Sequence, residues 1–329
     1  MQKIFLIAAG VSLGILLYAQ QTEKKGPKRP PPPGIPAVQR AMSTIKPLAI
    51  FDAESGTPDW QVLTDDAVWV ANGPRNAIHR LDVKANKIAA TITVGKKPCS
   101  GLTAGFGSVW SPSCGDKTLV RVDIGTNTVV ATIPVGPAES EGGIAASDDA
   151  VWLVTDRAGK LSRIDPKTNM VAATVDVPAG SAAVQYGDGA VWVTTPAKNM
   201  LTRVDVKTNK VTDSIPVGPE PRFETFGAGA AWTLNQGDGT ISRVDTKSRK
   251  VIATVTTGLP GEGGEIAYGL DHVWATLFRI PITEIDPETN TVIRQWVGDG
   301  GDSIRAGHGS VFLSNLRAHT IWRIDPKQL

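Results

Sequence analysis

The feature that most constrains this fold is a unit of about 40 residues that the chain repeats seven times. Each copy places an aromatic ring inside a short apolar run, as in the segment 190–193, Ala-Val-Trp-Val. The rings recur every 38 to 42 residues, at Trp69, Trp110, Trp152, Trp192, Trp232, Trp274 and Phe312. A period of this length with several short strands per unit is typical of propeller blades. The sequence therefore predicts an all-β, seven-bladed β-propeller.

The fourth copy predicts four strands per blade. Period-2 alternation of apolar and polar residues indicates strands at 182–186, 190–194, 200–206 and 210–217. A Gly-Asp-Gly turn at 187–189 separates the first pair, and an Asp-x-x-Thr-Asn turn separates the last pair. The alternation with these turns predicts four-stranded antiparallel blades.

The two ends of the chain predict how the ring closes. The chain stops after the third strand of its seventh copy, so that blade lacks a fourth strand. The segment 47–52 precedes the first complete blade and has the character of an isolated outer strand. Pairing this segment with the last three strands would hide two open sheet edges. We therefore expect one propeller domain over residues 47–329.

The residues before the propeller read as an export signal and a tether. A charged start and an apolar run from Ile4 to Ala19 are typical of a signal peptide, here 1–20, with a retained anchor as the alternative. Residues 21–46 form a basic, Pro-rich linker. Removal of the signal would leave a periplasmic or secreted protein without a transmembrane segment. We expect a monomer.

Charge gives no support for nucleic-acid binding. The whole chain has a net charge of +2, while residues 22–46 carry six basic groups and one acidic group. The propeller itself is therefore mildly acidic, which does not suit a phosphate backbone.

Two repeated positions are expected to be structural. The repeat Trp lies in the middle of a strand, where a broad ring can fill the wedge between neighbouring blades. An Arg-x-Asp pair follows in six of the seven copies, as in Arg203 and Asp205. A ligand site would not need so many copies, so we interpret these groups as bridges between turns and blades.

The predicted binding face is the rim formed by the crossovers between blades and by the loops between second and third strands. These segments differ from copy to copy, whereas the turns of the opposite rim are nearly uniform. The candidate ligand-binding residues are Trp60, Glu141, Arg222, Phe223, Glu224, Glu265, Asp302 and Arg305. The two rings form either an aromatic platform for a flat ligand such as a sugar or a plug in the channel. The carboxylates either hold a hard cation such as Ca²⁺ or are solvated loop charges; no cofactor is predicted beyond that divalent cation.

The two cysteines are expected to form a disulfide. If the first two strands of the second copy turn at Phe106 and Gly107, Cys99 faces Cys114 across the pair. An exported chain with two cysteines in this register suits a disulfide, and two free thiols are the alternative.

The unit Val-Trp-Val, Arg-Val-Asp-x-x-Thr-Asn-x-Val and Ile-Pro-Val-Gly resembles the YVTN-type propeller repeat over residues 47–329. Proteins of that kind are exported or surface seven-bladed propellers. The chain is more distantly similar to streptogramin (virginiamycin B) lyases, in which a metal-assisted His/Glu site opens a cyclic lactone. That second resemblance implies a metal-dependent lyase acting on a cyclic ester, with Glu262 and Glu265 as its acidic residues.

The histidines favour binding over catalysis. His272 and His308 fall in turns of the uniform rim, and His79 and His319 begin third strands, outward from the axis. A general base must lie within hydrogen-bond reach of the proton that it removes. The sequence therefore predicts a ligand-binding or protein-interaction module for a protein, peptide or carbohydrate, without a catalytic residue.

Overall fold

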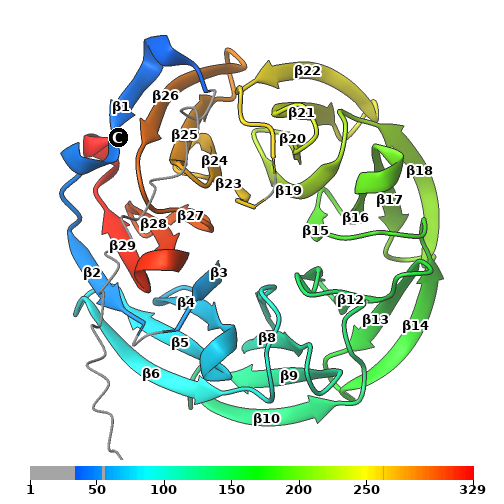
Figure 1. Cartoon of the computed structure of the whole chain (residues 1–329). Helices are drawn as coiled ribbons and strands as arrows, with labels where there is room; N and C mark the ends of the chain where they lie inside the picture. The colour runs from blue at the N-terminus through cyan, green and yellow to red at the C-terminus, as the bar shows by residue number, and fades with distance from the viewer. Residues whose placement is uncertain (1–33, 54–55, 262) are drawn as a thin grey trace, which may run out of the picture. The chain divides into compact units, whose positions relative to one another are not determined.

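The computed structural model describes residues 34–53, 56–261 and 263–329, which lie in one compact unit. Seven sheets follow one another in a ring, and within each complete blade the chain runs from the innermost strand outward (Figure 1). The blade partners are antiparallel, which confirms the predicted seven-bladed β-propeller.

Blades 1 to 3 begin the ring. Blade 1 consists of β3 (Pro58–Leu63), β4 (Ala67–Asn72), β5 (Ala77–Asp82) and β6 (Lys87–Thr93). Blade 2 consists of β7 (Thr103–Gly105), β8 (Ser108–Ser113), β9 (Thr118–Asp123) and β10 (Thr128–Ile133). Blade 3 consists of β11 (Ile144–Ala146), β12 (Val151–Asp156), β13 (Lys160–Asp165) and β14 (Met170–Asp176).

Blades 4 to 6 repeat the same order. Blade 4 consists of β15 (Val184–Gly187), β16 (Ala190–Thr195), β17 (Met200–Asp205) and β18 (Lys210–Pro216). Blade 5 consists of β19 (Pro221–Gly227), β20 (Ala230–Asn235), β21 (Thr240–Asp245) and β22 (Lys250–Thr256). Blade 6 consists of β23 (Ile266–Gly269), β24 (His272–Leu277), β25 (Ile280–Asp286) and β26 (Thr291–Val297).

Blade 7 is completed by the N-terminal part of the chain, as predicted. Its three C-terminal strands are β27 (Ile304–Gly307), β28 (Ser310–Asn315) and β29 (Thr320–Ile324). Strand β2 (Ala49–Asp52) pairs antiparallel with β29, from Ala49 opposite Arg323 to Asp52 opposite Thr320. Phe51 points from β2 into the core, which fixes the register of this closing strand.

A further N-terminal strand lies on the neighbouring blade. Strand β1 (Gln39–Ala41) pairs in parallel with β26 and makes blade 6 five-stranded. Met42 and Ile45, which follow it, are buried in a core cluster with Trp296. The described end of the expected linker therefore packs against the propeller.

The repeated Trp and Arg have the structural roles that their spacing predicts. The six repeat Trp side chains are at most 1% exposed and lie in the cores between blades. Arg121 reaches from blade 2 to the next blade, where it donates to the carbonyl oxygen of Pro166 at 2.6 Å and to Asn169 Oδ1 at 3.0 Å. Arg243 makes the same bridge from blade 5 to blade 6. Arg323 bridges blade 7 to blade 1 in the same way. Arg80, Arg163 and Arg203 instead contact Asp66, Asp149 and Thr212 in their own blades.

Within the described residues, no helix is long and apolar enough to cross a bilayer.

Candidate functional site

Two bulged strands shape the variable rim near the axis. The innermost strands β3 and β19 have six and seven residues, whereas the other innermost strands have three or four. The register shifts between Pro58 and Gln61 in β3, and between Pro221 and Phe223 in β19. Bulges commonly re-aim side chains next to functional sites. Here they fall at Asp59 and Trp60 and at Arg222.

Trp60 and Phe223 pack against each other although they belong to blades 1 and 5. Their ring centroids are 5.7 Å apart in an edge-to-face arrangement, and each residue is 5% exposed. The two blades are not neighbours in the ring, so the pair spans its centre. This is the plug arrangement, and it leaves neither ring face open as a platform for a flat ligand.

Asp59, the neighbour of Trp60 in β3, forms a carboxyl pair with Asp302. Their side chains hydrogen-bond each other, and Ser100 Oγ donates to Asp59 Oδ2 at 2.7 Å. Burial raises the pKa of both groups, and the neighbouring charge on Asp59 raises that of Asp302 further. The pair therefore retains a proton to higher pH than two free aspartates do.

A second group joins blades 3 and 5. Arg222 Nη2 lies 3.1 Å from Glu139 Oε1 and 3.9 Å from Glu141 Oε1. Burial and the nearby Asp59 carboxylate raise the pKa of Glu141 to about 7, although Arg222 opposes that shift. Glu141 therefore changes charge near neutral pH.

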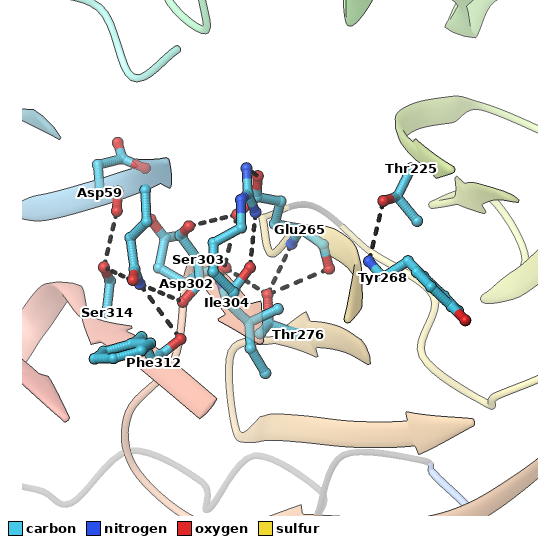
Figure 2. Close-up of polar contacts among 12 residues, drawn as sticks. Asp59, Thr225, Glu265, Tyr268, Thr276, Asp302, Ser303, Ile304, Phe312 and Ser314 are labelled. Atoms are coloured by element: carbon cyan, nitrogen blue, oxygen red, sulfur yellow. Dashed lines mark hydrogen bonds and ion pairs between the residues drawn. The ribbon is translucent and has the colours of Figure 1, made fainter. Parts of the chain in front are cut away.

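The third group joins blades 6 and 7. Arg305 Nη2 lies 2.5 Å from Glu265 Oε1, while Ser303 Oγ and the Ile304 N–H donate to the other Glu265 oxygen (Figure 2). Burial raises the pKa of Glu265 despite these partners. Thr276 accepts from the Glu265 N–H at 2.7 Å and donates to the Asp302 carbonyl oxygen, which links this group to the carboxyl pair (Figure 2).

We call these side chains together the axial cluster. The three groups are electrostatically coupled, because the charges of Asp59, Glu265 and Glu141 all raise the pKa of Asp302. The members of the cluster are Asp59, Ser100, Glu139, Glu141, Arg222, Glu265, Asp302, Ser303 and Arg305. Five carboxyl groups face only two arginines, so the cluster suits an incoming positive charge.

A pocket opens beside the cluster between blades 1 and 2. Its volume is about 420 Å³, and Asp59, Lys97, Ser100 and both cysteines are among its lining residues. In the part of the chain that the structure describes, no three His, Cys, Asp or Glu side chains converge as a metal site.

The disulfide lies at this pocket. Cys99 and Cys114 are bonded, with their Cα atoms 5.3 Å apart, which confirms the predicted pairing. The ladder differs slightly from the expected register, because Pro98 pairs with Ser113. The Ser100 N–H donates to the Ser140 carbonyl oxygen at 3.3 Å, so the bridged loop also touches the segment that carries Glu139 and Glu141. The disulfide therefore anchors residues of the axial cluster.

The structure brings together five of the predicted face residues in the axial cluster: Glu141, Arg222, Glu265, Asp302 and Arg305. Glu224 lies elsewhere, opposite Thr233 in β20, and is 2% exposed. Neither of its carboxyl oxygens has a hydrogen-bond partner, and burial raises its pKa well above the usual value. Glu262 lies outside the described residues.

Sequence reasoning missed Asp59, Ser100 and Glu139. Counting back from each repeat Trp assumes an unbroken ladder, and that assumption skips Asp59 because of the bulge in β3. The signal that was available is the length of the segment before Trp69, which leaves room for a longer innermost strand.

Three of the four histidines have partners outside the axial cluster. His79 Nε2 lies 2.8 Å from Asn72 Nδ2, and His79 Nδ1 lies 3.0 Å from Thr91 Oγ1. His272 Nε2 lies 3.7 Å from Glu284 Oε1, and His319 Nδ1 contacts the Gly56 carbonyl oxygen. None of these contacts places an imidazole at the axial carboxyl groups.

Comparison with known proteins supports the fold. Residues 130–248 match a family described as a repeat of unknown function, DUF6923. No curated protein matches the chain significantly. Virginiamycin B lyase from Staphylococcus aureus is similar in structure, with a TM-score of 0.71 at 15% identity, covering 84% of this chain and 98% of that one.

Two further structures give the same result. A streptogramin B lyase has a TM-score of 0.71 at 19% identity, covering 83% of this chain and 95% of that one. A catalytically inactive variant of the Staphylococcus aureus virginiamycin B lyase, determined with quinupristin, has a TM-score of 0.70 at 16% identity and covers 83% and 96%. The chain is thus a seven-bladed propeller that distantly resembles the streptogramin lyases in fold.

Proposed function

We propose that this protein is an exported binding module whose axial cluster receives a positively charged side chain of a peptide or protein ligand. The observation that carries the proposal is the excess of carboxyl groups over arginines at the inner ends of the blades. Arg222 lies closer to Glu139 than to Glu141, and Asp59 faces another carboxyl group. An ammonium or guanidinium group could pair with these carboxylates and replace the proton that the aspartate pair retains.

The adjoining pocket supports a ligand larger than an ion. It extends from Asp59 and Ser100 along the disulfide loop and has room for a side chain with part of its backbone. Loops on a rigid propeller are a common location for such recognition.

Lyase chemistry is the second candidate, and the likeness of the folds is what favours it. The known variant named above is inactive after replacement of one histidine, according to its description. In this chain, the contacts of His79, His272 and His319 lie away from the axial carboxyl groups. The arrangement therefore supports binding better than base-assisted elimination.

Calorimetry at pH 8 tests the proposal with a short peptide that carries one internal lysine and with its Nε-acetylated twin. We expect saturable binding of the lysine peptide and at least tenfold weaker binding of the acetylated one. The double variant Glu141→Gln, Asp302→Asn should lose at least tenfold, whereas Glu220→Gln, an exposed change on the same rim, should bind normally.

Three results would count against the proposal. If both peptides bind equally well, or if neither binds, the site does not recognise a positively charged side chain. Saturable uptake of Mg²⁺ or Ca²⁺ that the double variant loses would assign the carboxylates to a metal instead. Conversion of quinupristin by the wild-type protein, detected by chromatography, would assign the protein to the lyases.

A further inference from the structure

A second pocket lies on the variable rim between blades 6 and 7, outside the axial cluster. Its volume is about 750 Å³. Its lining comes from the loop between β24 and β25, from the end of β26 and the loop after it, from β28, the turn after it and β29, and from the segment after β1. The residues that matter below are Met42, Phe278, Asn315, Arg317, Trp322 and the loop 298–301.

Asn315 offers this pocket a buried hydrogen-bond donor that the protein does not use. Its Oδ1 accepts from the Gly301 N–H at 2.9 Å, which fixes the orientation of the amide. Its Nδ2 is buried and has no partner, and the residue is 2% exposed. An unpaired buried N–H is costly, so an unsatisfied group beside a cavity points to a missing acceptor.

Two other blades show how the fold normally satisfies this amide. Asn72 and Asn235 end β4 and β20 as Asn315 ends β28. Asn72 Nδ2 lies 2.8 Å from His79 Nε2, and Asn235 Nδ2 donates to Ser242 Oγ at 2.9 Å. The neighbouring strand of the same blade supplies a partner in both cases. Asn72 Nδ2 also donates to the Ala53 carbonyl oxygen, and Asn235 Nδ2 also donates to Thr240 Oγ1.

Blade 7 has no acceptor at the position that matches His79 and Ser242. Thr320, which matches Thr240, lies opposite Asn315, but its Oγ1 makes no hydrogen bond. His79 and Ser242 each lie opposite the residue that follows the repeat Trp, namely Val70 and Thr233. The matching position in blade 7, opposite Leu313, is Trp322. An indole has no acceptor to offer an amide N–H. Trp322 instead lines the pocket as an apolar surface.

The remaining lining favours an anionic ligand with an apolar body. Arg317 and Arg279 bring positive charge, against the single carboxylate of Asp299. Arg317 is held over the ring of Phe278, with its Cζ 5.2 Å from the ring centroid. Met42, Ile45 and Trp322 supply the apolar part of the lining.

The loop that closes the pocket is built for close approach. Gly300 and Gly301 have φ values of 121° and 81°, and a Cβ on Gly300 would lie 2.5 Å from Asn315 Oδ1. A side chain at Gly300 is therefore excluded where the loop meets the asparagine.

We propose that this pocket is a second binding site, which takes a carboxylate attached to an apolar body. The carboxylate accepts the Asn315 Nδ2–H and pairs with the Arg317 guanidinium, while the apolar body lies against Met42 and Trp322. Such a carboxylate belongs either to a free organic acid or to the C-terminus of a peptide. The proposal does not depend on the axial cluster.

Calorimetry with the full chain tests the site with four probes. These are N-acetylphenylalanine, its C-terminal amide, a tripeptide that ends in free phenylalanine, and the amidated form of that tripeptide. We expect saturable binding of at least one carboxylate probe and at least tenfold weaker binding of its amide. Binding of the free acid alone indicates a small-molecule site, and binding of the tripeptide indicates C-terminus recognition.

Three variants test the residues. Asn315→Asp, which replaces the donor by an acceptor, and Arg317→Gln should each weaken binding at least tenfold. Trp322→His restores the acceptor found in blade 1 and should weaken binding by occupying the amide. Arg75→Gln removes an arginine from the equivalent turn of blade 1, Gly73–Arg75, and should leave binding unchanged.

Arg317 is exposed enough to be replaced without loss of the fold, so this variant keeps the test decisive if Asn315→Asp fails to fold. No saturable binding of any probe to the wild-type protein would overturn the proposal. Equal affinity for acid and amide, or undiminished binding by Arg317→Gln, would also overturn it.

Discussion

Glu224 in blade 5 occupies the position that Gln61 occupies in blade 1. Each lies opposite the residue after the repeat Trp, Thr233 and Val70 respectively. Gln61 Nε2 donates to Ser314 Oγ at 2.9 Å in the preceding blade, whereas neither carboxyl oxygen of Glu224 has a partner. The position suits an N–H donor, and burial holds Glu224 in its neutral acid form by raising its pKa.

Glu224→Gln is therefore expected to stabilise the protein. Because the pKa of Glu224 is raised on folding, its stability contribution is complete below about pH 4.3 and is lost as the pH rises toward the folded pKa. The glutamine side chain does not titrate, so the variant does not lose stability at this position as the pH rises. We expect a gain on the order of 1 to 3 kcal/mol at pH 7.5 and little change at pH 4, measured by urea unfolding.

The reciprocal change is the control for this position. Gln61→Glu should destabilise blade 1 at pH 7.5, since a carboxylate cannot donate to Ser314 Oγ. A Glu224→Gln variant that is no more stable than the wild-type protein at pH 7.5 would show that the carboxyl group is satisfied in solution.

Glu141 should make ligand binding depend on pH near neutrality. Its pKa of about 7 means that it is neutral at pH 6 and charged at pH 8. Affinity for the lysine peptide should therefore rise severalfold between these values in the wild-type protein. Calorimetry on Glu141→Gln should show a smaller increase in affinity between pH 6 and pH 8. An identical pH profile in both proteins would show that Glu141 does not contact the ligand.

The disulfide should contribute measurably to stability. It closes a sequence separation of 15 residues, for which loop-closure entropy gives about 3 kcal/mol. The double variant Cys99→Ser, Cys114→Ser should have a free energy of unfolding lower by this amount, measured by urea unfolding. Mass spectrometry should show that reduction adds two hydrogens and exposes two alkylatable thiols; two thiols that react before reduction would contradict the bond.

The closing strand β2 offers a matched pair of substitutions. Phe51 is 2% exposed and Ile50 is 57% exposed, although they are neighbours on the same strand. Phe51→Ala should destabilise the protein by about 3 to 5 kcal/mol, whereas Ile50→Ala should cost less than about 0.5 kcal/mol. Equal losses in thermal unfolding would mean that β2 does not close the ring in solution.

The architecture could be predicted because the sequence repeats the same local pattern seven times. Each Trp marks the middle of a second strand, and the missing fourth strand in blade 7 identifies 47–52 as its replacement. Strand β1 was not predicted, because three residues between Pro-rich and polar segments are too few to show a periodic pattern. Its partner also lies far away in the sequence, in blade 6.

The candidate site was predictable only in part. The choice of rim depends on loop variation, which the sequence displays directly. The bulges at Asp59 and Arg222 decide which charged side chains lie together, because a one-residue slip changes the direction of every following side chain. The free amide of Asn315 depends on what faces it across the blade, and this becomes visible only when β28 is aligned with β4 and β20.

The two N-terminal strands also dictate the order in which the ring can be completed. Strand β2 pairs with β29, and β1 pairs with β26, so both partners are made more than 250 residues later. During synthesis the first strands to appear therefore wait until almost the whole chain is available. Contacts so distant in sequence slow folding, and unpaired edges invite association with other chains in the meantime. We therefore expect closure of the ring to come late in folding, and the outer edges of blades 6 and 7 are where a chaperone would have most to protect.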